Sequence, residues 1–275
     1  MKIWRTAAAA LVMTTYAANM VSAAETETPS GEVYVFIAAS LGNAMEEIKE
    51  GFEEQNPEVQ ILYNADSSGT LQVQIEEGAR CDIFFSAARK QMDALAEKKL
   101  IVDGTDTDIL ENKVVLIKPS GQETEVTGFE DITKADNLAL AGESVPVGQY
   151  AREIFENLDM IDEIEKMEIN EGKNVSEVLA AVSEGSNEVG IVYQTDAASA
   201  KDSVEILAEA PKDSLETPVR YPAGMVNDPE ASKEEQEAAK LFFKYLQSDE
   251  VQEIYEKYGF TVVEDETEDK EAAVS

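Results

Sequence analysis

The chain has 275 residues, of which 43% are hydrophobic, so it is long enough and apolar enough for one large domain or two lobes. Its formal net charge of -35 argues against nucleic acid and anionic membrane surfaces as partners, because both require basic patches. It contains no histidine, which excludes Ser-His-Asp catalysis and histidine-ligated metal sites, and its single cysteine, Cys81, is expected to be a buried core residue.

The N-terminal segment has the pattern of a secretory signal peptide. Lys2 and Arg5 precede an uncharged run at residues 6–21, and small residues at 21–24 fit a cleavage site. We therefore expect residues 1–24 to be removed and the mature protein to be periplasmic or otherwise extracytoplasmic. An uncleaved membrane anchor fits less well, because the run is short and rich in alanine and threonine.

The body of the chain alternates between strand-like apolar runs and amphipathic helices. Strands are predicted at residues 33–38, 59–63, 81–86, 113–117, 137–141 and 189–193. A single long helix is expected to close the fold and to end at Tyr258. This pattern predicts an α/β protein, and the two series of strands indicate two lobes. The acidic residues 264–275 predict a disordered tail.

Four turns share one design, in which a strand-like run ends in a short turn and a helix begins. They lie at residues 38–41, 66–70, 144–148 and 170–175. A helix N-terminus presents free N–H groups and the positive end of a dipole, so it binds an anion without a cationic side chain. Ligands of open α/β sheets bind beyond the carboxyl ends of the strands, which is where these turns lie. The sequence therefore predicts a site for a small anion.

Five residues at these positions are candidates for contact with the anion. Ser40 and Ser68 begin helices and offer hydroxyl groups, whereas Val147 and Val175 offer only backbone N–H groups. Tyr193 ends a strand and offers a phenol hydroxyl. Taken alone, Ser40 also fits an N-cap and Tyr193 a half-buried core tyrosine, so their candidacy depends on the four turns together.

Several segments resemble the periplasmic molybdate-binding proteins of ABC transporters, which are type II substrate-binding proteins. The matching segments are residues 36–45, 67–71, 81–87, 145–151, 190–197 and 258–260, and the resemblance spans residues 33 to 263. It implies a two-lobed fold with mixed sheets flanked by helices and two crossover strands, near Asn112 and Tyr221. The first lobe would comprise residues 33–112 and 222–263, and the second residues 113–221.

The resemblance also implies a function, which is capture of molybdate or tungstate in the cleft between the lobes and delivery to the permease of an ABC importer. It assigns the ligand contacts to hydroxyl and main-chain groups of Ser40 and Ser68, main-chain groups of Val147 and Val175, and the hydroxyl of Tyr193. Molybdenum would be bound only as its oxyanion. We expect a monomer that uses no cofactor and catalyses no reaction.

Two other interpretations stay open at this point. The same scaffold could bind sulfate, phosphate or another small anion, and a serine or carboxylate hydrolase is a third possibility, although Ser40 has no histidine partner. Two residues depart from the family pattern. Gly69 stands where some relatives have serine, and Asp66 stands where a small neutral residue is expected. Because a carboxylate would repel a dianion, we expect Asp66 to point away from the pocket and to cap the helix.

Overall fold

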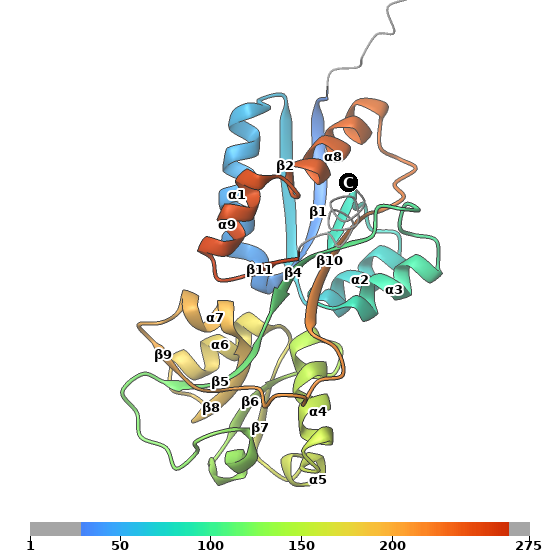
Figure 1. Cartoon of the computed structure of the whole chain (residues 1–275). Helices are drawn as coiled ribbons and strands as arrows, with labels where there is room; N and C mark the ends of the chain where they lie inside the picture. The colour runs from blue at the N-terminus through green and yellow to red at the C-terminus, as the bar shows by residue number, and fades with distance from the viewer. Residues whose placement is uncertain (1–28, 264–275) are drawn as a thin grey trace, which may run out of the picture.

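The computed structural model describes residues 29–263, which form two lobes, one above the other in Figure 1. Each lobe is built around its own mixed sheet, as the sequence predicts. The expected signal peptide, residues 1–24, and the expected disordered tail, residues 264–275, lie outside the described residues. Within the described part of the chain, no helix has both the length and the apolar character needed to cross a membrane.

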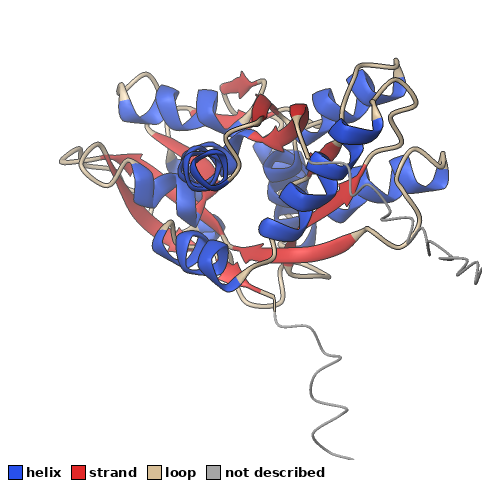
Figure 2. Cartoon of the chain, turned by 90° about the horizontal axis from the view of Figure 1, so that it is seen from above, coloured by secondary structure: helices blue, strands red, loops and turns tan. Residues whose placement is uncertain are grey.

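The first lobe contains a six-stranded sheet. In spatial order its strands are β11 (Thr261–Val262), β4 (Thr107–Asn112), β10 (Val219–Met225), β3 (Ile83–Phe85), β1 (Gly31–Ala38) and β2 (Val59–Asp66). Strand β1 is parallel to β2 and β3, whereas β10 runs antiparallel to β3 and β4. The helices of this lobe are α1 (Gly42–Gln55), α2 (Ser68–Glu76), α3 (Arg89–Glu97), α8 (Lys233–Tyr245) and α9 (Asp249–Lys257). They lie on both sides of the strands (Figure 2).

Strand β1 is apolar along nearly its whole length because both of its faces are covered. Successive side chains of a strand point to opposite faces. Val35 and Ile37 pack in the core cluster that includes α1, α8 and α9, whereas Phe36 packs in a separate cluster with α2 and α3. This two-sided burial fixes β1 in the middle of the lobe and holds its carboxyl end at the interface with the second lobe (Figure 1).

The second lobe contains a five-stranded sheet. In spatial order its strands are β7 (Ile169–Gly172), β6 (Leu138–Ala141), β8 (Val189–Tyr193), β5 (Val114–Pro119) and β9 (Val204–Glu209). Strands β7, β6 and β8 are parallel, and β5 is antiparallel to β8 and β9. The helices are α4 (Pro146–Asn157), α5 (Ile161–Ile164), α6 (Val175–Ser183) and α7 (Gln194–Ser199).

The chain passes between the two sheets twice. It leaves the first sheet after Asn112, enters the second at Val114, and returns between the end of β9 and the start of β10. Tyr221, near which the second crossover is predicted, lies inside β10. The exact division of the chain into lobes stays a prediction.

The expected single closing helix is wrong, because it is two helices, α8 and α9. Helix α8 ends at Tyr245, and Ser248 is the N-cap residue of α9. Asp249 and Glu250 follow in the first turn of α9, where negative charge favours a helix N-terminus. The sequence Ser248-Asp249-Glu250 is therefore a helix start inside an otherwise continuous apolar periodicity.

Candidate functional site

One small cavity between the lobes is lined by residues at or just before the N-termini of four helices. Helices α1, α2, α4 and α6 begin just after the carboxyl ends of β1, β2, β6 and β7, with a 3-10 turn, η1 (Ala39–Leu41), leading into α1. The cavity is lined by Ala38, Ala39, Ser40, Asp66, Ser67, Ser68, Ala87, Val145, Pro146, Val147, Val175 and Tyr193. All five residues singled out from the sequence are in this set. Their contact with an anion stays a prediction.

Three residues of the cavity wall lie in the first turns of helices. Ser68 and Val175 are the first residues of α2 and α6, and Val147 is the second residue of α4. N–H groups in the first turn of a helix have no partner within that helix. No lysine or arginine is among the lining residues. Positive charge in this part of the cavity wall is therefore limited to backbone N–H groups and helix dipoles.

The local sequence sets the residue at which each of these helices begins. The Ser67 side chain accepts a hydrogen bond from the Thr70 N–H at 3.1 Å, and the Asn174 side chain accepts one from the Glu177 N–H at 3.0 Å. Pro146 occupies the first turn of α4, where its missing N–H costs nothing. Capping by side chains next to the cavity leaves the N–H groups of Ser68, Val147 and Val175 available.

The Ser68 hydroxyl is oriented by a backbone group of the first lobe. Its Oγ accepts a hydrogen bond from the Ala87 N–H at 2.9 Å, and Ser68 is completely buried. Because the oxygen already accepts this bond, the hydroxyl proton remains to be donated toward the cavity. Sequence analysis assigned no role to Ala87, although the segment 81–87 is one of those that resemble the family.

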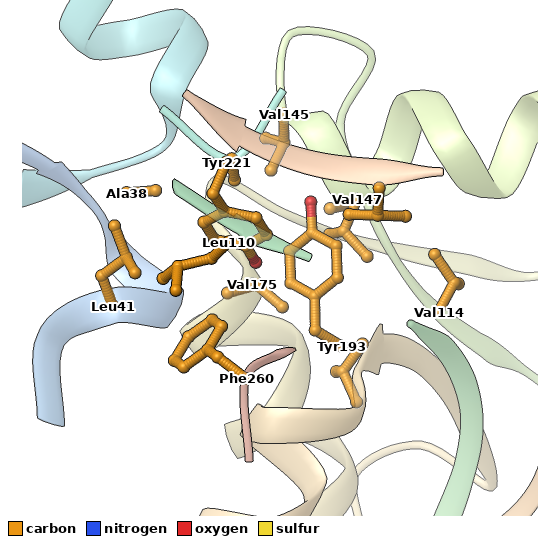
Figure 3. Packing of buried hydrophobic residues seen from close by; sticks show 14 of the residues in the cluster. Ala38, Leu41, Leu110, Val114, Val145, Val147, Val175, Tyr193, Tyr221 and Phe260 are labelled. Carbon is orange, nitrogen blue, oxygen red and sulfur yellow. The ribbon is translucent and has the colours of Figure 1, made fainter. Parts of the chain in front are cut away.

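The Tyr193 hydroxyl has no hydrogen-bond partner among the described residues, although Tyr193 is 1% exposed. Its ring packs edge to face against Tyr221 at 5.6 Å, and its oxygen is directed toward Val145 and Val147 (Figure 3). Burial raises the pKa of this phenol well above 10, so the hydroxyl stays protonated. A buried polar group without a partner is costly, and this one lines the cavity.

The expectation that Asp66 caps the helix is wrong, whereas the expectation that its carboxylate points away from the pocket stays a prediction. Ser67 is the N-cap of α2, and Asp66 lines both the cavity and the groove outside it. The Asp66 Oδ1 atom accepts hydrogen bonds from the Ser67 N–H at 2.7 Å and from Asn174 Nδ2 at 3.4 Å. The physical reason is that Ser67 already caps α2, since its hydroxyl accepts from the Thr70 N–H. The Asp66 side chain is therefore left to bond with Asn174 of the second lobe.

Gly69 is in contact with the second lobe through its backbone. A Cβ atom at this position would lie 2.0 Å from the Ser144 carbonyl oxygen, which is far inside van der Waals contact. Gln91 of α3 donates a second interlobe hydrogen bond to Gln149 of α4, at 3.3 Å. Together with the Asp66–Asn174 bond, these contacts hold the lobes closed over the cavity. Gly69 is thus required by the close approach of the lobes, which sequence analysis did not foresee.

Asp196 lies beneath the Tyr193 end of the cavity and is 7% exposed. Burial raises the pKa of its carboxyl from 3.8 to about 7, although the Tyr193 N–H donates to it at 3.2 Å. Between these two pH values the folded protein holds a proton that the unfolded chain has released. The carboxyl therefore lowers the free energy of unfolding progressively as pH rises from about 4 to about 7.

We expect Asp196→Asn to stabilise the protein at about pH 8 and to have little effect at about pH 4. The amide avoids the burial of a charge and still accepts the Tyr193 bond, whereas its unpaired N–H2 offsets part of the gain, which leaves about 1–2 kcal/mol. Urea unfolding of parent and variant at both pH values measures the difference. If the two proteins differ in free energy of unfolding by the same amount at both pH values, Asp196 does not become a buried charge at pH 8.

A much larger cavity, of ≈ 890 Å3, lies elsewhere, against the first lobe. It is lined by residues such as Ile75, Leu100 and Val226, and the charge of Arg80 at its edge is paired with Asp228 and Glu235. The described residues also contain no group of three or more Cys, Asp or Glu side chains placed to hold a metal ion.

Comparison with known proteins agrees with this geometry. Residues 33–261 match the family of bacterial extracellular solute-binding proteins. YvgL of Bacillus subtilis, provisionally assigned as an ABC transporter substrate-binding lipoprotein, is 40% identical over 225 residues, which cover 82% of this chain and 84% of YvgL. The molybdate-binding protein ModA of Haemophilus influenzae is 35% identical over 241 residues, covering 84% and 91% of the two chains.

A solved structure shows the same similarity. The substrate-binding domain of a provisionally assigned molybdenum ABC transporter from Clostridium difficile is 36% identical, with a TM-score of 0.63. The match covers 85% of this chain and 99% of that domain. The similarity therefore extends over both lobes and includes every segment that lines the cavity.

Proposed function

Because the chain belongs to the family of bacterial extracellular solute-binding proteins, we propose that it captures molybdate in the interlobe cavity and delivers it to the permease of an ABC importer. Ser40 and Ser68 donate through hydroxyl and main-chain groups, and Val147 and Val175 through main-chain N–H groups. Tyr193 completes the set with its phenol. The chain is secreted through residues 1–24 and acts as a monomeric receptor that returns its ligand unchanged.

The observation that carries this proposal is the buried hydroxyl of Tyr193, a residue that lines the cavity, because this hydroxyl has no hydrogen-bond partner among residues 29–263. A fixed donor of this kind is satisfied when an anion oxygen accepts its proton. The cavity is also small, with a volume of ≈ 10 Å3. Organic ligands require pockets of several hundred Å3, so a single small ion is the appropriate ligand.

The chemistry of the donors favours molybdate over phosphate. Molybdate, tungstate and sulfate carry no proton near neutral pH, whereas hydrogenphosphate keeps one and needs an acceptor for it. A buried donor that faces another donor costs about 1–3 kcal/mol, which corresponds to tenfold discrimination or more. Sulfate is smaller and cannot reach every fixed donor at once. Tungstate is nearly the size of molybdate, so we expect it to bind almost as well.

The high negative charge of the chain does not oppose anion binding at this site. Surface carboxylates are screened beyond about 8–10 Å, whereas the N–H groups act at hydrogen-bond distance. The lobes contribute different donors, Ser40 and Ser68 from the first and Val147, Val175 and Tyr193 from the second. A ligand that contacts both lobes stabilises the closed form, and the permease recognises that closed shape.

Thermal unfolding of the mature protein with molybdate, tungstate, sulfate or phosphate tests the proposal. A ligand present at 1,000 times its dissociation constant adds about 4 kcal/mol of stability. We expect a large upward shift of Tm with molybdate and tungstate alone. If none of the four anions shifts Tm, the cavity is not an oxyanion site and the proposal fails.

A second candidate is the same receptor with a protonated anion such as hydrogenphosphate as its ligand. The observation that favours it is that Asp66 is among the residues lining the cavity, because a carboxylate there would accept the proton of such an anion. A Tm shift with phosphate and none with molybdate would establish this alternative. Asp66→Asn would then weaken phosphate binding, whereas it would strengthen molybdate binding by removing a negative charge.

A further inference from the structure

A buried hydrogen-bond network joins the two lobes beside the cavity. Asn112 Nδ2 donates to Thr195 Oγ1 at 2.9 Å and to Tyr221 Oη at 3.2 Å. Tyr221 Oη and Ser40 Oγ lie 2.9 Å apart, and Ser40 lines the cavity. Asn112, Thr195 and Tyr221 are 9%, 5% and 0% exposed. Asn112 ends the last strand before the chain crosses to the second lobe, so the network connects both lobes with a cavity residue.

The orientation of the Asn112 amide in this network follows from a backbone contact. The Lys113 N–H donates to Asn112 Oδ1 at 2.9 Å, which orients the amide so that its N–H2 group faces Thr195 and Tyr221. Tyr221 Oη thus accepts a proton from Asn112, and we assign its own proton to the bond with Ser40 Oγ, in which either oxygen can donate. Burial keeps the pKa of the Tyr221 phenol well above 10, so this proton is always present.

We propose that Asn112 and Tyr221 are positioning residues that fix the Ser40 hydroxyl as a donor into the cavity and so make the site select fully deprotonated oxyanions. An unconstrained serine hydroxyl either donates or accepts, and would therefore accept the proton of hydrogenphosphate. When one lone pair of its oxygen accepts from Tyr221, the Ser40 proton is left to be donated into the cavity. This inference rests on the proposed function, because it concerns selection by the same cavity.

Two variants test the direction of the hydrogen bond between Tyr221 and Ser40. One reverses this bond and the other removes it. In Asn112→Asp, the carboxylate accepts protons from Tyr221 and Thr195, so Tyr221 accepts from Ser40 and a lone pair of Ser40 faces the cavity. In Tyr221→Phe, Ser40 loses its donor and is free to donate or accept. Both changes lower the preference for molybdate over hydrogenphosphate. The added charge in Asn112→Asp repels both dianions alike, so it does not account for a change in their ratio.

The experiment is titration calorimetry of parent and variants at about pH 8, where molybdate and hydrogenphosphate are both dianions and differ in one proton. Hydrogenphosphate affinity is read from its competition with molybdate. We expect the affinity ratio of molybdate to hydrogenphosphate to fall about tenfold in Tyr221→Phe and further in Asn112→Asp. If Asn112→Asp does not fold, the ratio in Tyr221→Phe decides.

A matched control is Tyr255→Phe, which also removes a buried phenol hydroxyl. Tyr255 makes no hydrogen bond through that group within the described part of the chain, and it is not among the residues lining the cavity. We expect it to leave the ratio unchanged. An unchanged ratio in Tyr221→Phe, even with weaker molybdate binding, overturns the positioning roles and leaves the proposed function standing. A parent protein that binds neither anion refutes the proposed function instead.

Discussion

Tyr193→Phe is expected to stabilise the ligand-free protein and to weaken molybdate binding. The hydroxyl is buried without a partner among the described residues. Its removal therefore eliminates a desolvation cost of about 1 kcal/mol that no hydrogen bond offsets. In the complex the same hydroxyl donates to an anion, and a hydrogen bond to a charged group contributes about 1.5–3 kcal/mol, equivalent to roughly ten- to hundredfold in affinity. Few substitutions shift stability and binding in opposite directions in this way.

Thermal unfolding with and without molybdate measures both effects in one series, and calorimetry gives the affinity. Tyr255→Phe is the control, because its hydroxyl is also buried without a partner but its ring packs against Phe85 and Phe260 in the first lobe. It should share the gain in stability and keep the parent affinity. Unchanged affinity in Tyr193→Phe would remove the phenol from the site, and a loss of ligand-free stability would mean that the hydroxyl has a partner.

The fold class could be predicted because both faces of the central strands are buried. Val35, Phe36 and Ile37 are consecutive apolar residues whose side chains serve two different core clusters, and only a covered strand has this pattern. The strands that escaped prediction are those at or near the sheet edges and crossovers. Strand β10 contains Pro222 and a register shift at Tyr221, and proline is a poor strand former.

The positions of the cavity residues could be predicted for a related reason. The carboxyl ends of β1, β2, β6 and β7 are followed at once by helices, and the chain has no other way to connect parallel strands over short distances. What the pattern does not contain is the pairing of side chains across the lobes. The bonds of Asp66 with Asn174 and of Asn112 with Thr195 join residues 108 and 83 positions apart, and no local periodicity encodes them.

The split between α8 and α9 illustrates a different limit. The apolar periodicity continues through Leu246 and Val251, both fully buried, because both helices pack on the same core. Periodicity reports which face is buried and is insensitive to a break of a few residues between two helices that share that face. The break is indicated in the sequence by Ser248, the N-cap residue of α9. This single residue is a weaker signal than the apolar pattern around it.

Gly69→Ala is expected to weaken molybdate binding by at least about tenfold without unfolding the first lobe. The new methyl group would overlap the Ser144 carbonyl oxygen, a rigid backbone atom of the other lobe, so the lobes could approach only by shifting apart. Each donor of the second lobe would then sit farther from an anion held by Ser40 and Ser68. Since alanine is the better helix former by about 1 kcal/mol, α2 itself should not be weakened.

Calorimetry gives the affinity, and small-angle scattering with saturating molybdate gives the degree of closure. Gly42→Ala is the matched control, because Gly42 also lies in the first turn of a helix, while a Cβ atom there meets nothing within 4 Å. Scattering should show the parent and Gly42→Ala contracting on binding and Gly69→Ala remaining wider. Parent-like affinity and contraction in Gly69→Ala would mean that the lobes in the complex are farther apart than in this structure, and closure would then depend on the ligand contacts rather than on the fit between α2 and Ser144.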